Sequence, residues 1–230
     1  MEYKTSVVDN TAPLFNEDLN FKIEKIIKKN NLCERFEIFK QTETYEHTQR
    51  VSEYTRIIAN CLGLPKSLKD RLALLAPIHD IGKLLVDQEI LNAERALSKE
   101  EFEHIKTHST LGYNLLKGHN CDLLDDAALV AYGHHEKWDG TGYPLGLKGN
   151  EIDIFSRIIC AADVFDALIS ERPYKNPWTY EEICGFFIKM RGTQFDPKVA
   201  DAVINNFNEL IDVHQKHKDK TINISLKLVG

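Results

Sequence analysis

The sequence predicts an all-α protein, on three observations. Apolar residues recur three and four positions apart over most of residues 17–213, as in Val51, Tyr54, Ile58 and Leu62, and this spacing gives a helix one buried face. Signals for helix starts precede several of these segments. Apolar residues make up 43% of the 230 residues and charged residues 28%, so the chain can bury a core of ordinary size.

Three predicted helices have clear starting signals. Ser67 precedes LKDRLALLA and Ser98 precedes KEEFEHIKTH, and serine is a favoured N-cap. In FDPKVADAV, Asp196 suits the N-cap position and Pro197 the first helical position. Residues 140–149, GTGYPLGLKG, have no helical period and are predicted to form a shaped loop between two helices. Long ordered loops are often functional.

The two ends of the chain differ from the helical middle. Ile222, Ile224, Leu226 and Leu228 alternate with polar residues, which predicts a β-strand. Residues 3–7 could supply a second short strand, in the same subunit or across a homodimer. Short strands at the two termini are therefore part of the predicted fold.

Composition excludes several classes of function. The formal charge is −6, which disfavours broad contact with the phosphates of duplex nucleic acid. The longest apolar stretches fall far short of the roughly 20 residues that span a bilayer, and the polar start has no signal-peptide core. A cytoplasmic location is expected. The five cysteines form no CxxC pair, so reduced, mostly buried thiols are expected.

Histidines beside carboxylates point to a metal centre. Imidazole and carboxylate ligands together suit Mn, Fe, Zn or Ni, and the absence of paired cysteines argues against a structural thiolate zinc site. Asp80 directly follows His79. On a helix the two side chains would diverge by about 100°, so the carboxylate could bridge two metals. By contrast, His104 is interpreted as a surface or supporting residue. The residues concerned are Glu43 with His47, His79 with Asp80, His108, His134 with His135, and Asp163.

Two motifs make the sequence recognisable. Residues 79–83 read HDIGK and residues 134–144 read HHEKWDGTGYP, and the chain resembles the HD-GYP family, a branch of the HD-domain metal-dependent phosphohydrolases. Matching segments occur in the family's order over about residues 37–210. The resemblance implies an HD-type helical bundle that hydrolyses cyclic dinucleotides, chiefly cyclic di-GMP, in bacterial signalling. It also implies a helical extension over 1–36, an HD-GYP domain over 37–212 and a tail over 213–230.

The resemblance implies a ligand for each position of a metal centre. Two or three divalent ions, Fe or Mn, are expected. Asp80 would bridge two of them, and Glu43 corresponds to a carboxylate that supports a third ion in some members. The first ion would be held by His47, His79, Asp80 and Asp163, and the second by Asp80, His108, His134 and His135.

Phosphodiester cleavage requires a nucleophile and neutralisation of the phosphoryl oxygens. Two metals can supply both, because a metal-bound water can reach a pKa of about 7. Asp80 and Lys83 are the predicted catalytic residues. Lys83, Arg172 and Lys175 are predicted to contact phosphate, since Arg suits bidentate oxygen recognition and Lys acts as a point charge.

The predicted loop adds substrate and partner contacts. Gly142 and Tyr143 are predicted to bind substrate, with the Tyr143 ring stacking on or bordering a guanine. In the family this loop is also thought to contact proteins that synthesise cyclic di-GMP. Asp166 lies three residues after Asp163, on the same helical face, and could orient a ligand histidine by hydrogen bonding.

Two departures from the family and two alternatives remain. Tyr45 stands where the family often has a small residue, and NAERALSKEE replaces a segment that usually contains Lys-Pro-Gly; both concern local geometry. Opening of the ring to pGpG, and further cleavage to GMP, is the leading hypothesis. The alternatives are another 3′,3′-cyclic dinucleotide as substrate, or a weakly active module that binds nucleotide or a signalling partner.

Overall fold

The structure of the protein, a computed structural model, describes residues 17–42, 45–93, 95–171 and 176–218. Over these residues it is helical without a β-sheet, apart from one isolated bridge between Arg191 and Phe195, so the all-α prediction is confirmed there. The predicted terminal strands lie outside the described residues. The helices are α1 (Glu17–Lys29), α2 (Cys33–Thr42), α3 (Tyr45–Cys61), α4 (Lys66–Leu75), η1 (Ala76–Ile78), η2 (Ile81–Leu85), α5 (Gln88–Leu91), α6 (Lys99–Lys106), α7 (His108–Leu116), α8 (Asp122–Gly133), η3 (Gly149–Glu151), α9 (Ile154–Ile169), α10 (Tyr180–Met190), α11 (Pro197–Asn205) and α12 (Phe207–Lys216).

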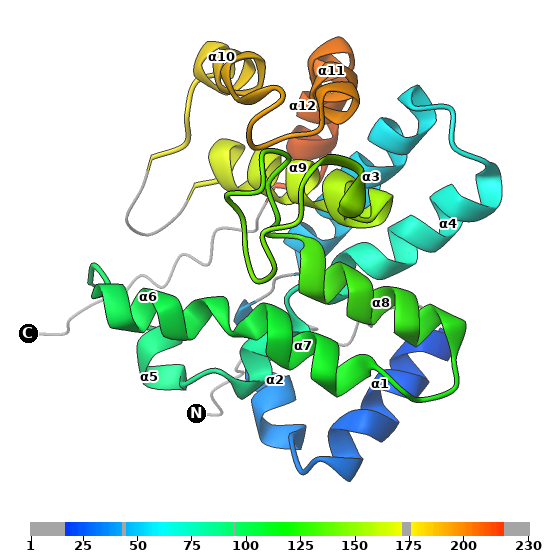
Figure 1. Cartoon of the computed structure of the whole chain (residues 1–230), viewed down its shortest axis with the longest axis vertical. Helices are drawn as coiled ribbons and strands as arrows, with labels where there is room; N and C mark the ends of the chain where they lie inside the picture. Colours follow the sequence, from blue (N-terminus) through cyan, green and yellow to red (C-terminus); the bar gives the residue numbers. More distant parts are fainter. Residues whose placement is uncertain (1–16, 43–44, 94, 172–175, 219–230) are drawn as a thin grey trace, which may run out of the picture.

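Helix α9 runs through the middle of the molecule, with α10, α11 and α12 towards one end and α1 and α2 towards the other (Figure 1). Its Phe165 is fully buried and packs edge-on against Tyr54 of α3 and Phe207 of α12, with ring centroids 5.1 and 5.6 Å apart. Such aromatic pairs add to the free energy of burial. Because α3 packs along α9, the two helices hold polar side chains at their contact in a fixed position.

Local sequence explains where the helices begin. Ser98 and Glu101 form a reciprocal capping box at the start of α6, and the Asp196 carboxylate accepts from the backbone N–H of Lys198 at the start of α11, as predicted. The predicted start after Ser67 was wrong by two residues, since a helix capped by Ser67 would begin at Leu68. Helix α4 begins at Lys66 because Pro65 occupies the N-cap, with φ of −56°, a backbone angle that suits the approach to a helix.

A close contact between backbones sets the position of η2 against α7. A Cβ atom added to Gly82 would lie 1.9 Å from the carbonyl oxygen of His108 and 2.6 Å from the backbone nitrogen of Gly112. No other residue fits there without moving one of the two segments. The glycine of HDIGK therefore brings residues 79 and 80 next to the start of α7.

None of the described helices combines the length and apolar character needed to cross a bilayer.

The thiols of the chain differ in their exposure. The five cysteines are free, but only Cys160 is buried, whereas Cys33 and Cys61 are exposed and the other two are half-buried. The prediction of mostly buried thiols was wrong, because Cys33 and Cys61 lie at helix ends, where side chains face away from the core.

Candidate metal centre

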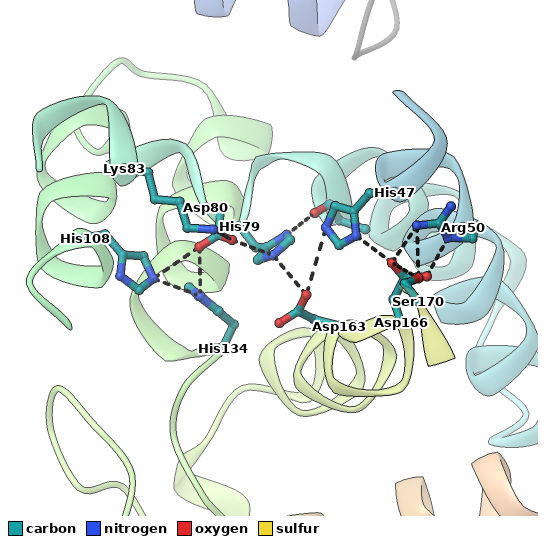
Figure 2. A network of polar contacts seen from close by, with 11 residues as sticks. His47, Arg50, His79, Asp80, Lys83, His108, His134, Asp163, Asp166 and Ser170 are labelled. Atoms are coloured by element: carbon teal, nitrogen blue, oxygen red, sulfur yellow. Dashed lines mark hydrogen bonds and ion pairs between the residues drawn. The ribbon is translucent and has the colours of Figure 1, made fainter. Parts of the chain in front are cut away.

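Two groups of metal-ligating side chains lie side by side between α3, η2, α7, α8 and α9 (Figure 2). In each group the potential ligand atoms all lie within 4.8 Å of one another. The sequence analysis predicted every member of both groups. One group contains His47, His79 and Asp163, and the other contains Asp80, His108, His134 and His135.

The first group joins three separate elements. The Asp163 carboxylate on α9 has its Oδ1 atom 3.9 Å from His47 Nε2 on α3 and 3.8 Å from His79 Nε2 in the turn after η1. Two atoms that each lie about 2.0–2.2 Å from one ion can have such a separation. The spacing therefore leaves room for a single cation between these three side chains.

Asp80 connects the two groups through its two carboxylate oxygens. Its Oδ2 atom lies 3.3 Å from His79 Nε2. Its Oδ1 atom lies 3.2 Å from His108 Nε2 and 3.6 Å from His134 Nε2. The carboxylate thus faces both groups at once, which is the placement expected of a bridging ligand.

Hydrogen bonds to Nδ1 fix the tautomers of the histidines. The Nδ1 atoms of His79, His108 and His134 lie 2.7, 2.7 and 3.0 Å from the carbonyl oxygens of Ala76, Ile105 and Ala131. A carbonyl oxygen can only accept, so each Nδ1 carries the proton and each Nε2 presents a lone pair to the centre. Metal-bound histidines show this pattern.

The tautomers provide a test of fit for a metal ion. His108 Nε2 and His134 Nε2 lie 3.2 Å apart, and two unprotonated nitrogens cannot hydrogen-bond to each other. The buried Oδ1 atom of Asp80 faces the same two nitrogens without a protein hydrogen-bond donor among the described residues. A shared cation would satisfy all three atoms, so the residues present fit divalent metal ions.

The protonation states favour ligation. Burial lowers the pKa of His134, and burial with the neighbouring imidazoles lowers the pKa of His135 far below its usual value. Burial would raise the pKa of Asp80, but that pKa is lowered well below the usual range, and the Lys83 ammonium beside the carboxylate is the largest opposing cause. Neutral imidazoles and an ionised carboxylate are the ligand forms that metals bind.

Behind His47, a buried ion pair fixes the orientation of its ring. His47 Nδ1 lies 2.8 Å from Asp166 Oδ2, and Arg50 donates to both carboxylate oxygens of Asp166, at 2.6 and 2.9 Å. Burial would raise the pKa of Asp166, but hydrogen bonds and charge from His47 and Arg50 lower it to about 2. The structure places Asp166 as predicted; Arg50, only 1% exposed, was not anticipated.

Of the other predicted residues, one lies beside the metal centre, one lies on the surface and three lie outside the described residues. Lys83 Nζ lies 2.5 Å from Asp80 Oδ2, which places a cation beside the bridging carboxylate, and its contact with phosphate stays a prediction. His104 is exposed and lies away from both groups, in line with its interpretation. Glu43, Arg172 and Lys175 lie outside the described residues.

The loop at residues 134–149 is held by Glu136, which sequence reasoning missed. This side chain is 3% exposed, and its carboxylate accepts from the backbone N–H groups of Leu145, Gly146 and Leu147 at 2.7–3.1 Å. A signal was available, since Glu136 directly follows the two histidines in HHEKWDG. Gly142 packs against this segment, and a Cβ there would lie 2.3 Å from the backbone nitrogen of Lys137. Position 142 therefore requires glycine, because a side chain there would collide with the backbone of Lys137.

Replacing Glu136 with glutamine is expected to lower the free energy of unfolding by about 1–3 kcal/mol, because a single amide oxygen replaces two charged oxygens that accept from three backbone N–H groups. Urea unfolding of the two proteins measures the difference. Glu151→Gln is the matched control, since this exposed carboxylate in η3, directly after the loop, accepts from the backbone N–H of Lys148. Equal stabilities of the Glu136 and Glu151 variants would contradict the role of Glu136.

The residues that depart from the family pattern leave the site intact. Tyr45 begins α3 with its side chain 41% exposed, so it does not displace His47. Within the described part of NAERALSKEE, Arg95 pairs with Glu101 at 2.6 Å and Ser98 caps α6. Both departures thus concern the surface.

Comparisons with known proteins agree with this geometry. A family profile described as HD domain matches residues 35–199. A protein of Thermotoga maritima named cyclic di-GMP phosphodiesterase is 37% identical over 223 residues, covering 96% of this chain and 59% of the relative. A Vibrio cholerae protein named 3′3′-cGAMP-specific phosphodiesterase 2 is 37% identical over 177 residues, covering 77% of this chain and 34% of the relative.

A solved structure supports the fold. An HDG"Y"P protein of Bdellovibrio bacteriovorus superposes with a TM-score of 0.60 at 18% identity, over 87% of this chain and 67% of that one. At this identity the likeness concerns the fold alone. The chain spans about three-fifths or less of the length of the two named phosphodiesterases.

Proposed function

The chain belongs to the HD-GYP branch of the HD-domain family, and on this premise we propose that it is a metal-dependent phosphodiesterase that hydrolyses cyclic di-GMP. The observation that carries the proposal is the Asp80 carboxylate, whose two oxygens face two separate groups of ligands. The relative from Thermotoga maritima named for this activity supports the choice of substrate.

Most residues of the site would bind metal ions, and a smaller set would bind substrate. Divalent ions, once bound, would supply Lewis acidity toward the phosphoryl oxygens and a nucleophile at neutral pH. His47, His79 and Asp163 would hold one ion, His108, His134 and His135 another, and Asp80 both. Fe and Mn both accept imidazole and carboxylate ligands, and a third ion through Glu43 belongs to the same proposal.

Two further side chains would act on the substrate itself. The Lys83 ammonium lies at the edge of the bridging carboxylate and would attract a phosphate oxygen as a point charge. Burial raises the pKa of Tyr143, so its phenol keeps its proton at neutral pH and can donate a hydrogen bond. Arg172 and Lys175 complete the proposed phosphate contacts. A cytoplasmic location, a homodimer and binding of cyclic di-GMP-synthesising proteins by the loop stay predictions.

A second substrate has an observation in its favour. The Vibrio cholerae relative named as 3′3′-cGAMP-specific is 37% identical to this chain over 177 residues, and the relative named for cyclic di-GMP is 37% identical over 223 residues. Bound metal ions would contact phosphate rather than bases, so the centre described above suits either nucleotide. Another 3′,3′-cyclic dinucleotide is therefore the alternative substrate.

Anaerobic turnover with Mn or Fe supplied tests the proposal. We expect cyclic di-GMP to be converted to pGpG, detected by chromatography, and the His79→Ala/Asp80→Ala double variant to be inactive because both ligand groups lose a member. GMP as the end product would support a third ion through Glu43. Faster cleavage of 3′3′-cGAMP in parallel reactions would favour the alternative substrate. Absence of turnover of either nucleotide by metal-loaded protein would refute the proposal and favour a binding module.

A further inference from the structure

A lysine outside the ligand groups connects α6 to the loop beside the metal centre. Lys106 is the last residue of α6, two positions before His108. Its Nζ atom lies 5.4 Å from the ring centroid of Phe102 and 5.3 Å from the ring centroid of Tyr143. Both distances are within the range in which an ammonium is attracted to an aromatic ring.

The same ring contacts a metal-ligating side chain. The rings of Tyr143 and His135 are stacked, with centroids 4.8 Å apart and planes 30° apart. The Tyr143 ring is half-buried. Tyr143 is thus placed between Lys106 and the metal centre.

The backbone and the ring of Tyr143 are fixed by different groups. Glu136 holds the backbone of residues 145–147, and the Tyr143 N–H donates to the His135 carbonyl oxygen at 3.2 Å. Those bonds leave rotation of the ring about its side-chain torsions unspecified. The ring itself stacks on His135 and lies beneath the Lys106 ammonium.

Lys106 is well suited to hold a ring in place. Glu103 lies 2.5 Å from its Nζ atom, so the carboxylate restrains the ammonium in addition to the rings of Phe102 and Tyr143. The Lys106 side chain is only 26% exposed, so it is partly removed from water. Desolvation strengthens attraction between a cation and a ring. The helix that carries Lys106 is itself fixed by the Ser98 capping box.

We propose that Lys106 is a positioning residue, whose ammonium, held by Phe102 and Glu103, keeps the Tyr143 ring stacked on His135. The phenol is thereby held beside a member of the metal centre, where its hydroxyl would be available to donate to a substrate phosphate. The kinetic part of this proposal rests on the proposed function, whereas the placement of the ring does not.

The placement is tested by 19F NMR of protein labelled with 3-fluorotyrosine. The chain has eight tyrosines, and Tyr143→Phe assigns the relevant signal by removing it. We expect Lys106→Met to shift and broaden that signal, and Lys106→Arg to retain it, because Arg also interacts with aromatic faces. Lys117→Met is the matched control: Lys117 Nζ lies 4.7 Å from the Tyr113 ring, so this variant loses the same kind of contact elsewhere. An unmoved Tyr143 signal in Lys106→Met would overturn the proposal.

Kinetics test the consequence for cleavage. We expect Lys106→Met to lower kcat/KM for cyclic di-GMP by about tenfold, Lys106→Arg to restore most of it, and Lys117→Met to leave it unchanged. In a Tyr143→Phe background, Lys106→Met should have no further effect. An equal loss in both backgrounds would show that Lys106 acts independently of Tyr143, against the proposal. If the native protein cleaves no cyclic dinucleotide, the proposed function fails, and the NMR result still decides the placement.

Discussion

Replacing Asp80 with alanine is expected to lower the rate of cyclic di-GMP cleavage by about 10³-fold, because several kcal/mol of transition-state stabilisation would depend on the ions that this carboxylate is proposed to bridge. The metal content after dialysis should also fall, since the group at His108, His134 and His135 loses the carboxylate that the described residues supply to it. Elemental analysis and initial rates measure the two effects on one preparation.

The fold should tolerate this change. The partner left behind, Lys83, is 25% exposed and can turn to water. Asp201→Ala is the matched control, because Asp201 also pairs with a cation, Arg191, but on the surface. A rate within tenfold of the native protein, with two ions still bound, would contradict the bridging role of Asp80.

Replacing Asp166 with asparagine is expected to have the largest effect on stability. The change breaks the buried ion pair between Arg50 and Asp166, and breaking such a pair typically costs about 3–5 kcal/mol. It also weakens the hydrogen bond that orients His47, and loss of such a bond lowers metal affinity by about 10–100-fold. Urea unfolding and metal titration of the purified variant measure these changes separately. Native-like stability would show that the buried pair contributes little.

The pH dependence of stability provides an independent check on Asp166. Its pKa is lowered from 3.8 to about 2 in the folded protein, so the folded state binds the proton less readily than the unfolded state. The resulting stabilisation, about 2 kcal/mol, is complete above about pH 4 and is lost as pH falls towards 2. With chelator present, the stability difference between native protein and Asp166→Asn should narrow by this amount over that interval. A constant difference would contradict the lowered pKa.

The sequence was most informative where a motif and a helical period coincide. Adjacency of His79 and Asp80 predicted a carboxylate that faces two groups, and the three-residue spacing of Asp163 and Asp166 predicted that one would support the other; the structure places both in this way. The structure also gathers the predicted ligands, apart from Glu43 outside the described residues, into two groups, while their binding of metal stays a prediction.

Contacts between distant segments could not be predicted from local patterns. Arg50 and Asp166 are 116 residues apart in sequence, and nothing in the periodicity of either helix pairs them. Lys106 reaches the Tyr143 ring only because α6 lies beside the loop, which depends on the packing of the whole bundle. The start of α4 was displaced because Pro65 already occupied the N-cap. These contacts and helix boundaries depend on how the neighbouring segments pack, which the spacing of residues within one helix does not specify.

The contact at Gly82 has a consequence for how this protein can diverge in evolution. Backbone atoms, and not side chains, set the separation between residues 79–80 and His108, because no Cβ fits at position 82. Substitutions elsewhere in the apolar core can therefore accumulate and change thermal tolerance without altering the spacing of the ligands across this contact.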